Sequence, residues 1–388
     1  MLRPPPQRRV LLLVEMSNRY GRGLLAGVGA YVRTSGSWTV TLVERGRGQA
    51  DLAQLGHWHG DGILARIDHR KLATAIGATG LPAVDLCGER LLPEAPWVEC
   101  DDRGVAELAL SHLAARGFRE FAYVGDRRFD WSRSRQRFIT DGARAQGRSC
   151  RTIDLAQGGE ALGRWLASLP RPCGIIACYD LAGMQVLAAA RRQHIPVPDS
   201  LAVVGVDDDE AVCALCDPPL SSIALDAQGA GMRACRLLDA MIDGAAPASL
   251  RNLLPPLRLI ERESTAGTAI EDPQLLRAVQ AMRTHAGRGM PVLAAARAGG
   301  LSRRSFELKL RAALGRSPGE EIARLRLAAI ARLFAETRLS LREVAERCGF
   351  RHAEYLHVFV RRMTGLTPGA WRRQLAGSGA HARNATAR

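Results

Sequence analysis

Two hydrophobic patterns alternate along residues 9–264. Short, continuous apolar runs such as Val10–Val14 and Leu201–Val206 are typical of buried parallel strands. Between such runs lie stretches like Gly23–Tyr31, whose apolar residues recur at helical spacing. This alternation predicts a parallel, doubly wound α/β sheet covered by helices, and the length suits two such lobes. The other predicted strands are Thr39–Val43, Gly62–Ala65, Ala83–Leu86, Phe121–Gly125 and Gly174–Cys178, and the other predicted helices are Val105–Ala115 and Leu181–Arg191.

The last third of the chain has a helical pattern that repeats at an interval of about fifty residues. Each copy consists of a helix, a short glycine-containing turn and a second helix. This is the helix-turn-helix plan, whose second helix enters the major groove of DNA. The sequence therefore predicts an all-α domain with two such motifs, joined by a helix over Ile322–Glu336. The matching segments are Gly315–Pro318 with Gly365–Pro368, and Phe306 and Leu310 with Leu356 and Val360.

Positive charge is concentrated in this repeated part. The whole chain has 388 residues and a formal net charge of +15. Residues 271–388 hold 22 Lys and Arg against 9 Asp and Glu, so they carry +13 of that charge. A GC-rich genome would also enrich arginine, but coincidence with two predicted recognition helices indicates double-stranded DNA, not a membrane, as the partner. The residues expected to contact DNA are Arg303, Arg304, Ser305 and Lys309 in the first copy, and Arg351, His352 and Arg361 in the second.

Polar and aromatic residues follow the ends of several predicted strands. In open α/β sheets, ligands bind beyond the carboxyl ends of the strands. Carboxylates and arginines form hydrogen bonds to hydroxyl groups, and an aromatic ring stacks on the apolar face of a sugar, so this mixture favours a polyol ligand. Taken singly, each aspartate has even odds of being a helix cap. The candidate ligand-binding residues are Tyr20, Arg22, Trp131, Arg135, Asp180 and Asp207.

Motifs for cofactors, metals and covalent catalysis are missing from the sequence. No glycine-rich phosphate-binding motif follows a strand and no nucleophile elbow is present, so we expect no cofactor. Cys213 and Cys216 lack a second ligand pair at zinc spacing. The nine scattered cysteines indicate reduced thiols, and the apolar run Val10–Val14 is too short for a signal or membrane segment. We therefore expect a cytoplasmic protein.

Several segments of residues 9–264 resemble the sensor core of lac-repressor-type regulators, which has the type I periplasmic-binding-protein fold. The segments are Arg116–Gly125, Ile195–Asp199, Val204–Asp208 and Pro218–Ile223, in the order of that family. The resemblance implies ligand contacts by Arg135, Asp180 and Asp207. The DNA-binding headpiece that usually precedes this sensor has no counterpart here, so DNA binding is expected from another part of the chain.

Residues 274–375 resemble the DNA-binding domain of AraC/XylS-type regulators, on the segments Ala345–Phe350 and Gly365–Arg372. The combination of this domain with a lac-repressor-type sensor is similar to the XylR-like regulators. That resemblance implies D-xylose or a related pentose as effector, a homodimer, and activation of transcription by RNA polymerase. Leu308 stands where that family often has a basic or polar residue. Glu15 and Gly21 also depart from the pattern at the rim of the pocket, so another sugar stays open.

The predicted order of domains is a tail over residues 1–8, a sensor over 9–264, a linker over 265–273, a DNA-binding domain over 274–376 and a tail over 377–388. Two other function classes stay open. Asp180 and Asp207 have the chemistry of an acid and base pair in a sugar-processing enzyme with a DNA-binding appendage, although no motif specifies one. A DNA-compacting protein is the third class, and it would bind DNA without sequence preference or effector response.

Overall fold

The computed structural model describes residues 7–35, 38–45, 53–267, 269–285 and 290–375. The chain folds into two compact units, one ending at Gly267 and one beginning at Thr268. The predicted C-terminal tail over 377–388 lies outside the described residues, as do residues 1–6 of the predicted N-terminal tail. Arg8, assigned to that tail, is already the first residue of a strand.

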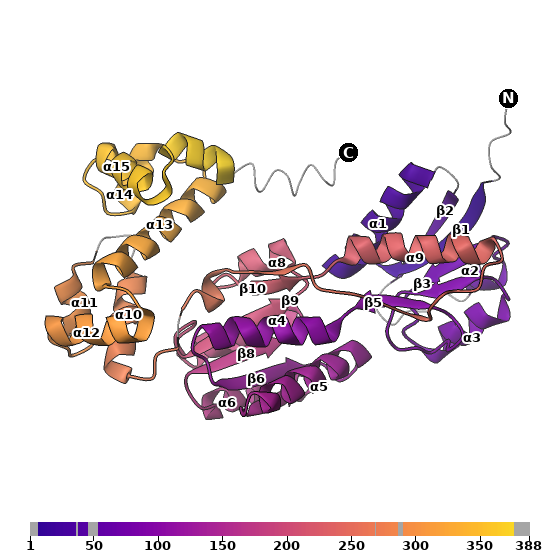
Figure 1. The fold of residues 1–388 in the computed structure, drawn as a ribbon, viewed down its shortest axis with the longest axis horizontal. Helices are drawn as coiled ribbons and strands as arrows, with labels where there is room; N and C mark the ends of the chain where they lie inside the picture. The colour runs from indigo at the N-terminus through magenta and orange to yellow at the C-terminus, as the bar shows by residue number, and fades with distance from the viewer. Residues whose placement is uncertain (1–6, 36–37, 46–52, 268, 286–289, 376–388) are drawn as a thin grey trace. The chain divides into compact units, whose positions relative to one another are not determined.

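The first unit contains two six-stranded sheets, each in its own lobe. The first sheet has the strand order β11-β5-β4-β3-β1-β2, and all its strand pairs within the described residues are parallel. Figure 1 shows α1 and α9 side by side over one face of this sheet and α3 on the other. The elements of this lobe are β1 (Arg8–Glu15), α1 (Arg19–Ser35), β2 (Trp38–Arg45), α2 (Ala53–Gly56), β3 (Gly62–Ala65), α3 (Arg70–Ala78), β4 (Ala83–Asp85), β5 (Trp97–Cys100), α9 (Ala227–Ile242) and β11 (Arg251–Leu254).

Strand β1 shows why the sheet strands have continuous apolar sequences. Alternate residues of a strand face opposite sides of its sheet. Val10, Leu12 and Val14 pack in the core that contains α1 and α9, whereas Leu11 and Leu13 pack in the core that contains α3. Because helices cover both faces, every position from Val10 to Val14 is apolar, as expected for a parallel sheet.

The second sheet has the strand order β12-β10-β9-β8-β6-β7, in which β10 and β12 are antiparallel and the other pairs are parallel. Helices α6, α7 and α8 pack over one face through a shared apolar core, and α4 packs against α5 in the same lobe. The elements are α4 (Asp102–Ala115), β6 (Glu120–Gly125), α5 (Asp130–Ala145), β7 (Cys150–Asp154), η1 (Leu155–Gln157), α6 (Gly159–Ser168), β8 (Cys173–Ala177), α7 (Asp180–Arg192), β9 (Leu201–Val206), α8 (Glu210–Leu215), β10 (Ser221–Ala224), β12 (Arg258–Ile260) and η2 (Glu263–Thr265).

The chain passes between the two lobes three times within residues 53–267. The passages lie between β5 and α4, between β10 and α9, and between β11 and β12. The last residues of this unit belong to the second lobe: Ser264 and Thr265 are fully buried, and Ser264 Oγ donates to the carbonyl oxygen of Val203 in β9 at 2.6 Å. Thr265, the first residue of the predicted linker, is therefore packed into the second lobe.

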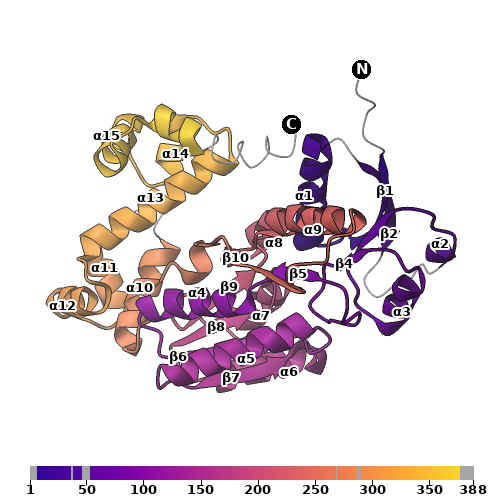
Figure 2. The same cartoon turned by 45° about the vertical axis from the view of Figure 1, so that its right-hand side comes forward.

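The second unit consists of helices only, within its described residues (Figure 2). It has two small apolar cores. Helix α13 contributes Ile322 and Leu325 to the first core and Ile330 and Phe334 to the second. A capping box between Ser317 and Glu320 begins this helix. The elements are α10 (Pro273–Thr284), α11 (Val292–Ala298), α12 (Arg303–Leu314), α13 (Pro318–Glu336), α14 (Leu341–Arg347) and α15 (Ala353–Thr364).

The fold class predicted from the sequence is confirmed: two α/β lobes of parallel sheet are followed by a helical domain with two helix-turn-helix motifs. Five strands had not been predicted, namely β5, β7, β10, β11 and β12. These strands have three to five residues each, and most of them carry polar residues.

Candidate ligand pocket and DNA-binding face

A pocket lies between the two lobes of the first unit. Both lobes contribute to its wall, and most of the contributing residues lie at or just beyond the carboxyl ends of strands. The lining residues are Asn18, Tyr20, Arg66, Glu99, Cys100, Asp102, Trp131, Arg135, Tyr179, Asp207 and Leu225.

Arg135 is a fixed positive charge in the wall of this pocket. It is 4% exposed, and its Nε and Nη2 atoms donate to Asp102 Oδ1 at 3.0 and 2.8 Å. Its Nη1 donates to the carbonyl oxygen of Cys178, and its guanidinium carbon lies 5.1 Å from the ring centre of Trp131. Burial lowers the pKa of Arg135, but the charge of Asp102 and the other acidic groups around it together raise that pKa above its usual value.

Two buried polar atoms of the pocket have no hydrogen-bond partner among the described residues. They are the hydroxyl of Tyr20 and the amide nitrogen of Asn18, and both residues line the pocket. Buried polar groups in proteins are almost always paired, so these atoms indicate a partner that is a ligand or water. Glu99 adds a further donor at neutral pH, because burial and then the charge of Asp102 raise its pKa to about 8.

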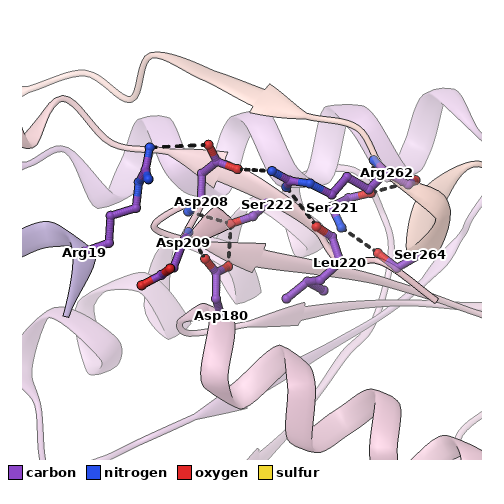
Figure 3. Close-up of polar contacts among 9 residues, drawn as sticks. All are labelled: Arg19, Asp180, Asp208, Asp209, Leu220, Ser221, Ser222, Arg262 and Ser264. Atoms are coloured by element: carbon purple, nitrogen blue, oxygen red, sulfur yellow. Dashed lines mark hydrogen bonds and ion pairs between the residues drawn. The ribbon is translucent and has the colours of Figure 1, made fainter. Parts of the chain in front are cut away.

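The loop after β9 is held by the buried carboxyl group of Asp180 (Figure 3). Asp180 Oδ2 accepts from the backbone nitrogen of Asp209 at 2.6 Å, and Oδ1 accepts from Ser222 Oγ at 2.5 Å. Asp207 and Asp208 have positive φ angles of 105° and 52°, which are strained for residues other than glycine. Burial and then the charge of Asp207 raise the pKa of Asp180 to about 8. These hydrogen bonds therefore maintain a strained loop that places Asp207 in the pocket wall.

The same loop is joined to both lobes by arginines. Arg262 Nη2 donates to Asp208 Oδ1 at 2.7 Å from the second lobe (Figure 3). From α1 in the first lobe, Arg19 lies 3.9 Å from the other carboxylate oxygen of Asp208, and Arg22 Nη2 donates to Asp209 Oδ2 at 2.9 Å. The loop after β9 thus receives an ion pair from each side of the cleft.

The structure brings together four of the six ligand-binding residues predicted from the sequence. Tyr20, Trp131, Arg135 and Asp207 line the pocket. Arg22 does not, because its guanidinium group turns outward to Asp209 and to the carbonyl oxygens of Met16 and Ser17. Asp180 does not line it either, because both its oxygens accept hydrogen bonds from the β9 loop and β10.

Sequence reasoning missed Arg66 and Glu99, which line the pocket from the first lobe. Arg66 directly follows β3, so the rule that selected polar residues beyond strand ends would have found it if applied to that strand. Glu99 lies inside β5, a strand the sequence analysis did not predict, and its sequence carries no comparable signal.

The first helix-turn-helix motif consists of α11 and α12. Gly300, with a φ of 71°, makes the turn, and Ser302 caps α12 by accepting from the backbone nitrogen of Ser305. Phe306 and Leu310 are buried in the first core. Of the predicted DNA contacts, Arg303 and Arg304 are exposed, Ser305 is half-buried, and Arg303 Nε donates to Glu307 at 2.9 Å. Lys309 Nζ donates to the carboxylate of Asp272, the N-cap of α10, at 2.5 Å, so this lysine also ties α12 to α10.

The second motif consists of α14 and α15, and its turn is one residue longer. Gly349 has a φ of 71°, and two residues lie between it and the N-cap His352, whereas one residue lies between Gly300 and Ser302. Arg351 therefore lies in the turn and not on the helix face where the sequence placed it. Arg351, His352 and Arg361 are all exposed.

Three family models match successive parts of the chain. Residues 9–102 match the XylR N-terminal domain, residues 110–265 a periplasmic binding protein-like domain, and residues 295–374 a helix-turn-helix domain. The xylose operon regulatory protein of Escherichia coli K12 is 29% identical over 382 residues, which cover 94% of this chain and 97% of that protein. Over nearly its whole length, the chain is thus similar to XylR-type transcription regulators. The protein of the same name from Haemophilus influenzae is 25% identical, with 94% of this chain and 98% of that protein covered.

Solved structures agree with this XylR-like assignment. The structure of a xylose-binding transcription activator, XylR, superposes with a TM-score of 0.79 and 27% identity, covering 96% of this chain and 99% of that one. A LacI family regulator from Bifidobacterium animalis covers 68% of this chain with a TM-score of 0.56 and 22% identity, which supports the fold of the first unit. The XylR-like chain is thus a DNA-binding transcription regulator and not an enzyme, so the acid and base roles considered for Asp180 and Asp207 are set aside.

Three further observations describe the chemistry of this XylR-like regulator. All nine cysteines are free thiols, including Cys213 and Cys216. In the part of the chain that the structure describes, no three His, Cys, Asp or Glu side chains are grouped to hold a metal ion. None of the helices there is both long and apolar enough to span a membrane.

Proposed function

We propose that this regulator binds D-xylose or a related pentose in the pocket between its lobes and thereby activates a sugar-catabolic operon. The named relatives support the class of sugar, since they are xylose regulators. The observation that carries the proposal is the pocket itself. It holds the unpaired buried hydroxyl of Tyr20 and amide of Asn18 beside the ring of Trp131, as a polyhydroxylated ligand with an apolar face requires.

In this proposal the six predicted residues have two different roles. Tyr20, Trp131, Arg135 and Asp207 touch the sugar directly, together with Asn18, Arg66 and Glu99. Arg22 and Asp180 are positioning residues that act through the loop after β9, because each of them bonds to Asp209. Arg135 and Asp207, which both line the wall, supply a donor and an acceptor for sugar hydroxyls.

Sugar binding would close the cleft, because the ligand contacts residues of both lobes. A ligand shifts such an equilibrium only by its difference in affinity for the open and closed states. The Arg19–Asp208 and Arg22–Asp209 pairs also join the lobes, so they would contribute to the stability of the closed state. The signal then passes to the second unit of a homodimer, which acts on RNA polymerase in the cytoplasm.

For the DNA-binding unit, we assign base-edge contacts to Arg303 and Arg304 with Ser305 beside them, and phosphate contacts to Lys309, Arg351 and Arg361. His352 precedes α15 and adds a donor at the start of that helix. Phosphate contacts position a protein without reading sequence. If Arg304 reads a guanine, Arg304→Ala should cost about 1–3 kcal/mol at one base pair. Binding assays against a set of single-base variants test this, and an equal loss on random DNA would contradict it.

Calorimetry of the full chain against D-xylose, D-ribose, L-arabinose and D-glucose, paired with binding to operator DNA, tests the proposal. We expect one pentose to bind with one site per chain and to change the affinity for DNA. Tight binding of a different compound would replace the sugar and keep the architecture. Binding of a pentose without any effect on DNA affinity or transcription would contradict the regulatory role. The domains proposed are those of the sequence analysis, with a sensor over 9–264 and a DNA-binding domain over 274–376.

A further inference from the structure

The second helices of the two helix-turn-helix motifs, α12 and α15, each expose one large aliphatic side chain at the same position of the repeat. Leu308 is 64% exposed, and so is Val358, fifty positions later. The buried pairs Phe306 and Leu310, and Leu356 and Val360, have the same spacing of fifty. An isolated exposed aliphatic residue is ordinary in a protein surface. Two at one register of a repeat indicate a shared role.

The helix geometry places these two side chains at the centre of the outward face. Successive residues of an α-helix are rotated by about 100°, so Leu308 lies about 160° around the helix axis from both Phe306 and Leu310. Leu308 is thus opposite the buried pair of α12. Val358 has the same relation to Leu356 and Val360 in α15.

Basic side chains lie one turn to both sides of Leu308 and one turn to one side of Val358. Arg304 and Arg311 lie one turn to either side of Leu308, and Arg361 lies one turn after Val358, and all three are exposed. A cationic face of this kind faces the DNA in a helix-turn-helix protein. Among the base edges in the major groove, the 5-methyl group of thymine is the apolar one.

We propose that Leu308 and Val358 each contact the 5-methyl group of a thymine, so that each recognition helix selects thymine at one position of the site. This rests on the assignment of α12 and α15 as the helices that enter the major groove. Burying the side chain against the methyl group removes apolar surface of both partners from water. The flanking arginines hold the helix against phosphates or guanines while the aliphatic side chain discriminates thymine from cytosine, which has no methyl group.

A substitution in the DNA tests the contact directly. A binding site is first selected with the full chain from random duplexes, and each thymine in it is then replaced by deoxyuridine, which lacks only the methyl group. We expect one sensitive thymine for each helix, with the two about ten base pairs apart. Loss of one buried methyl group should weaken binding about fourfold at each of them.

Protein variants test the same contacts by changing the side chain instead of the base. Leu308→Ala should abolish the effect of deoxyuridine at one thymine and keep it at the other, and Val358→Ala should do the reverse. Both substitutions are at exposed helix positions and favour the helix, so the fold is retained. Met363→Ala is the matched control on α15, because Met363 is 37% exposed and lies about 140° away from Val358 around the axis. It should leave both sensitive thymines unchanged.

Three results would overturn the inference. One is a selected site in which no thymine responds to deoxyuridine. Another is Leu308→Ala and Val358→Ala variants that bind the site as tightly as the wild type, which would assign these side chains to a protein partner. Failure to select any sequence would contradict the assignment of the DNA-reading helices, and it is distinguishable because the sugar-binding measurements would be unaffected.

Discussion

Two tyrosines of the sensor unit bury their hydroxyl groups in different circumstances. Tyr123 Oη donates to the carbonyl oxygen of Ser132 at 2.9 Å and is fully buried in the second lobe. Tyr20 is 9% exposed, and its hydroxyl has no partner among the described residues. An unmade hydrogen bond in a buried place costs free energy, so the folded protein carries a cost that a ligand removes on binding.

Tyr20→Phe should therefore weaken sugar binding without destabilising the protein. Loss of one hydrogen bond corresponds to about 0.5–1.5 kcal/mol, or about a twofold to tenfold rise in Kd. The melting temperature of the free protein should stay equal or rise, because the unpaired hydroxyl is removed. Calorimetry and thermal unfolding measure the two quantities. Tyr123→Phe is the matched control and should lower stability with little effect on Kd, whereas a stable Tyr20→Phe variant with unchanged Kd would contradict the role.

His112 makes the stability of the sensor depend on pH. Arg116 Nη1 donates to His112 Nδ1 at 3.1 Å, so the Nε2 proton of the neutral ring faces Thr265 Oγ1 at 2.9 Å. Burial, followed by the charge of Arg116, lowers the pKa of His112 from 6.5 to about 4. The ring thus stays neutral in the folded protein at pH values where it is protonated in the unfolded chain.

Because the folded-state pKa is the lower one, the free energy of unfolding should be unaffected by His112 above pH 6.5 and should fall between pH 6.5 and 4. Between pH 7 and pH 5, the free energy of unfolding of the His112→Gln variant should fall by about 1–2 kcal/mol less than that of the wild type, after allowance for the partial exposure of His112. Urea unfolding at several pH values measures this. His59→Gln, at an exposed position, is the control and should keep the wild-type pH dependence. Equal pH dependence in both variants would contradict the assignment.

The sequence predicted pocket residues where they follow a strand that could itself be recognised from the sequence. Tyr20, Trp131 and Arg135 follow strands whose apolar runs are unmistakable, so their convergence on one site was foreseeable. The direction in which the Asp180 side chain points was not foreseeable. Asp180 turns toward the β9 loop because it accepts hydrogen bonds from residues distant in sequence. The positive charge of Lys309 predicted a contact with DNA. Its ion pair with Asp272 was not foreseeable, because it depends on how α10 packs in the folded unit.

At the scale of elements, apolar periodicity predicted the buried strands and the turns of the repeat well. β3 and β9 have the predicted bounds, because their apolar runs end abruptly in polar residues. The edge strands β11 and β12 were missed, since Arg251–Leu254 and Arg258–Ile260 mix charged and apolar residues and lie after a crossover. Their pairing partners are distant in sequence, so local pattern does not reveal them.

The packing of α10 on α11 depends on the small size of Gly299. A Cβ atom at this position would lie 2.4 Å from the carbonyl oxygen of Gln274 and 2.9 Å from Ala278 Cβ, both in α10. Gly299→Ala should therefore cost about 1–3 kcal/mol of stability in the second unit, as overpacked positions do. Gly319→Ala is the matched control in α13, since its Cβ would meet nothing within 4 Å. It should stabilise the unit by about 0.5–1 kcal/mol. Chemical unfolding of the chain measures both, and equal effects would contradict the packing argument.

At the scale of the whole molecule, the sequence predicted two functional parts, and the structure has two compact units. The boundary between the units lies within the linker predicted over residues 265–273. Thr265, at the start of the predicted linker, is nevertheless buried in the first unit, where Oγ1 lies 2.7 Å from Ser221 Oγ. Its carbonyl oxygen accepts from Arg116 Nε at 2.8 Å. The residues around Thr265 are mostly polar, and nothing in their composition reveals that Thr265 is buried among several hydrogen-bond partners.

A sensor fragment that ends at residue 264 should therefore be less stable than one that ends at residue 267. It lacks the hydrogen bonds of Thr265 to Ser221, His112 and Arg116, worth about 1 kcal/mol each. For a unit of this size, that corresponds to a melting temperature lower by about 5–10 °C. Calorimetric melting of both fragments measures the difference. Thr265→Val in the longer fragment should show an intermediate loss, and equal melting of the two fragments would contradict the packing of this segment.

Because one chain carries two unlike helix-turn-helix motifs, the DNA it reads has a direction. α12 presents Arg304 and Ser305 where α15 presents Glu354 and Tyr355, and the turn before α15 is one residue longer. Palindromic sites suit proteins whose two reading faces are identical and exchanged by a twofold axis. No rotation exchanges these two faces, so each bound chain has a head and a tail along the chromosome. Turning the site around would present the opposite end of the protein to a neighbouring promoter, even though every base contact is kept.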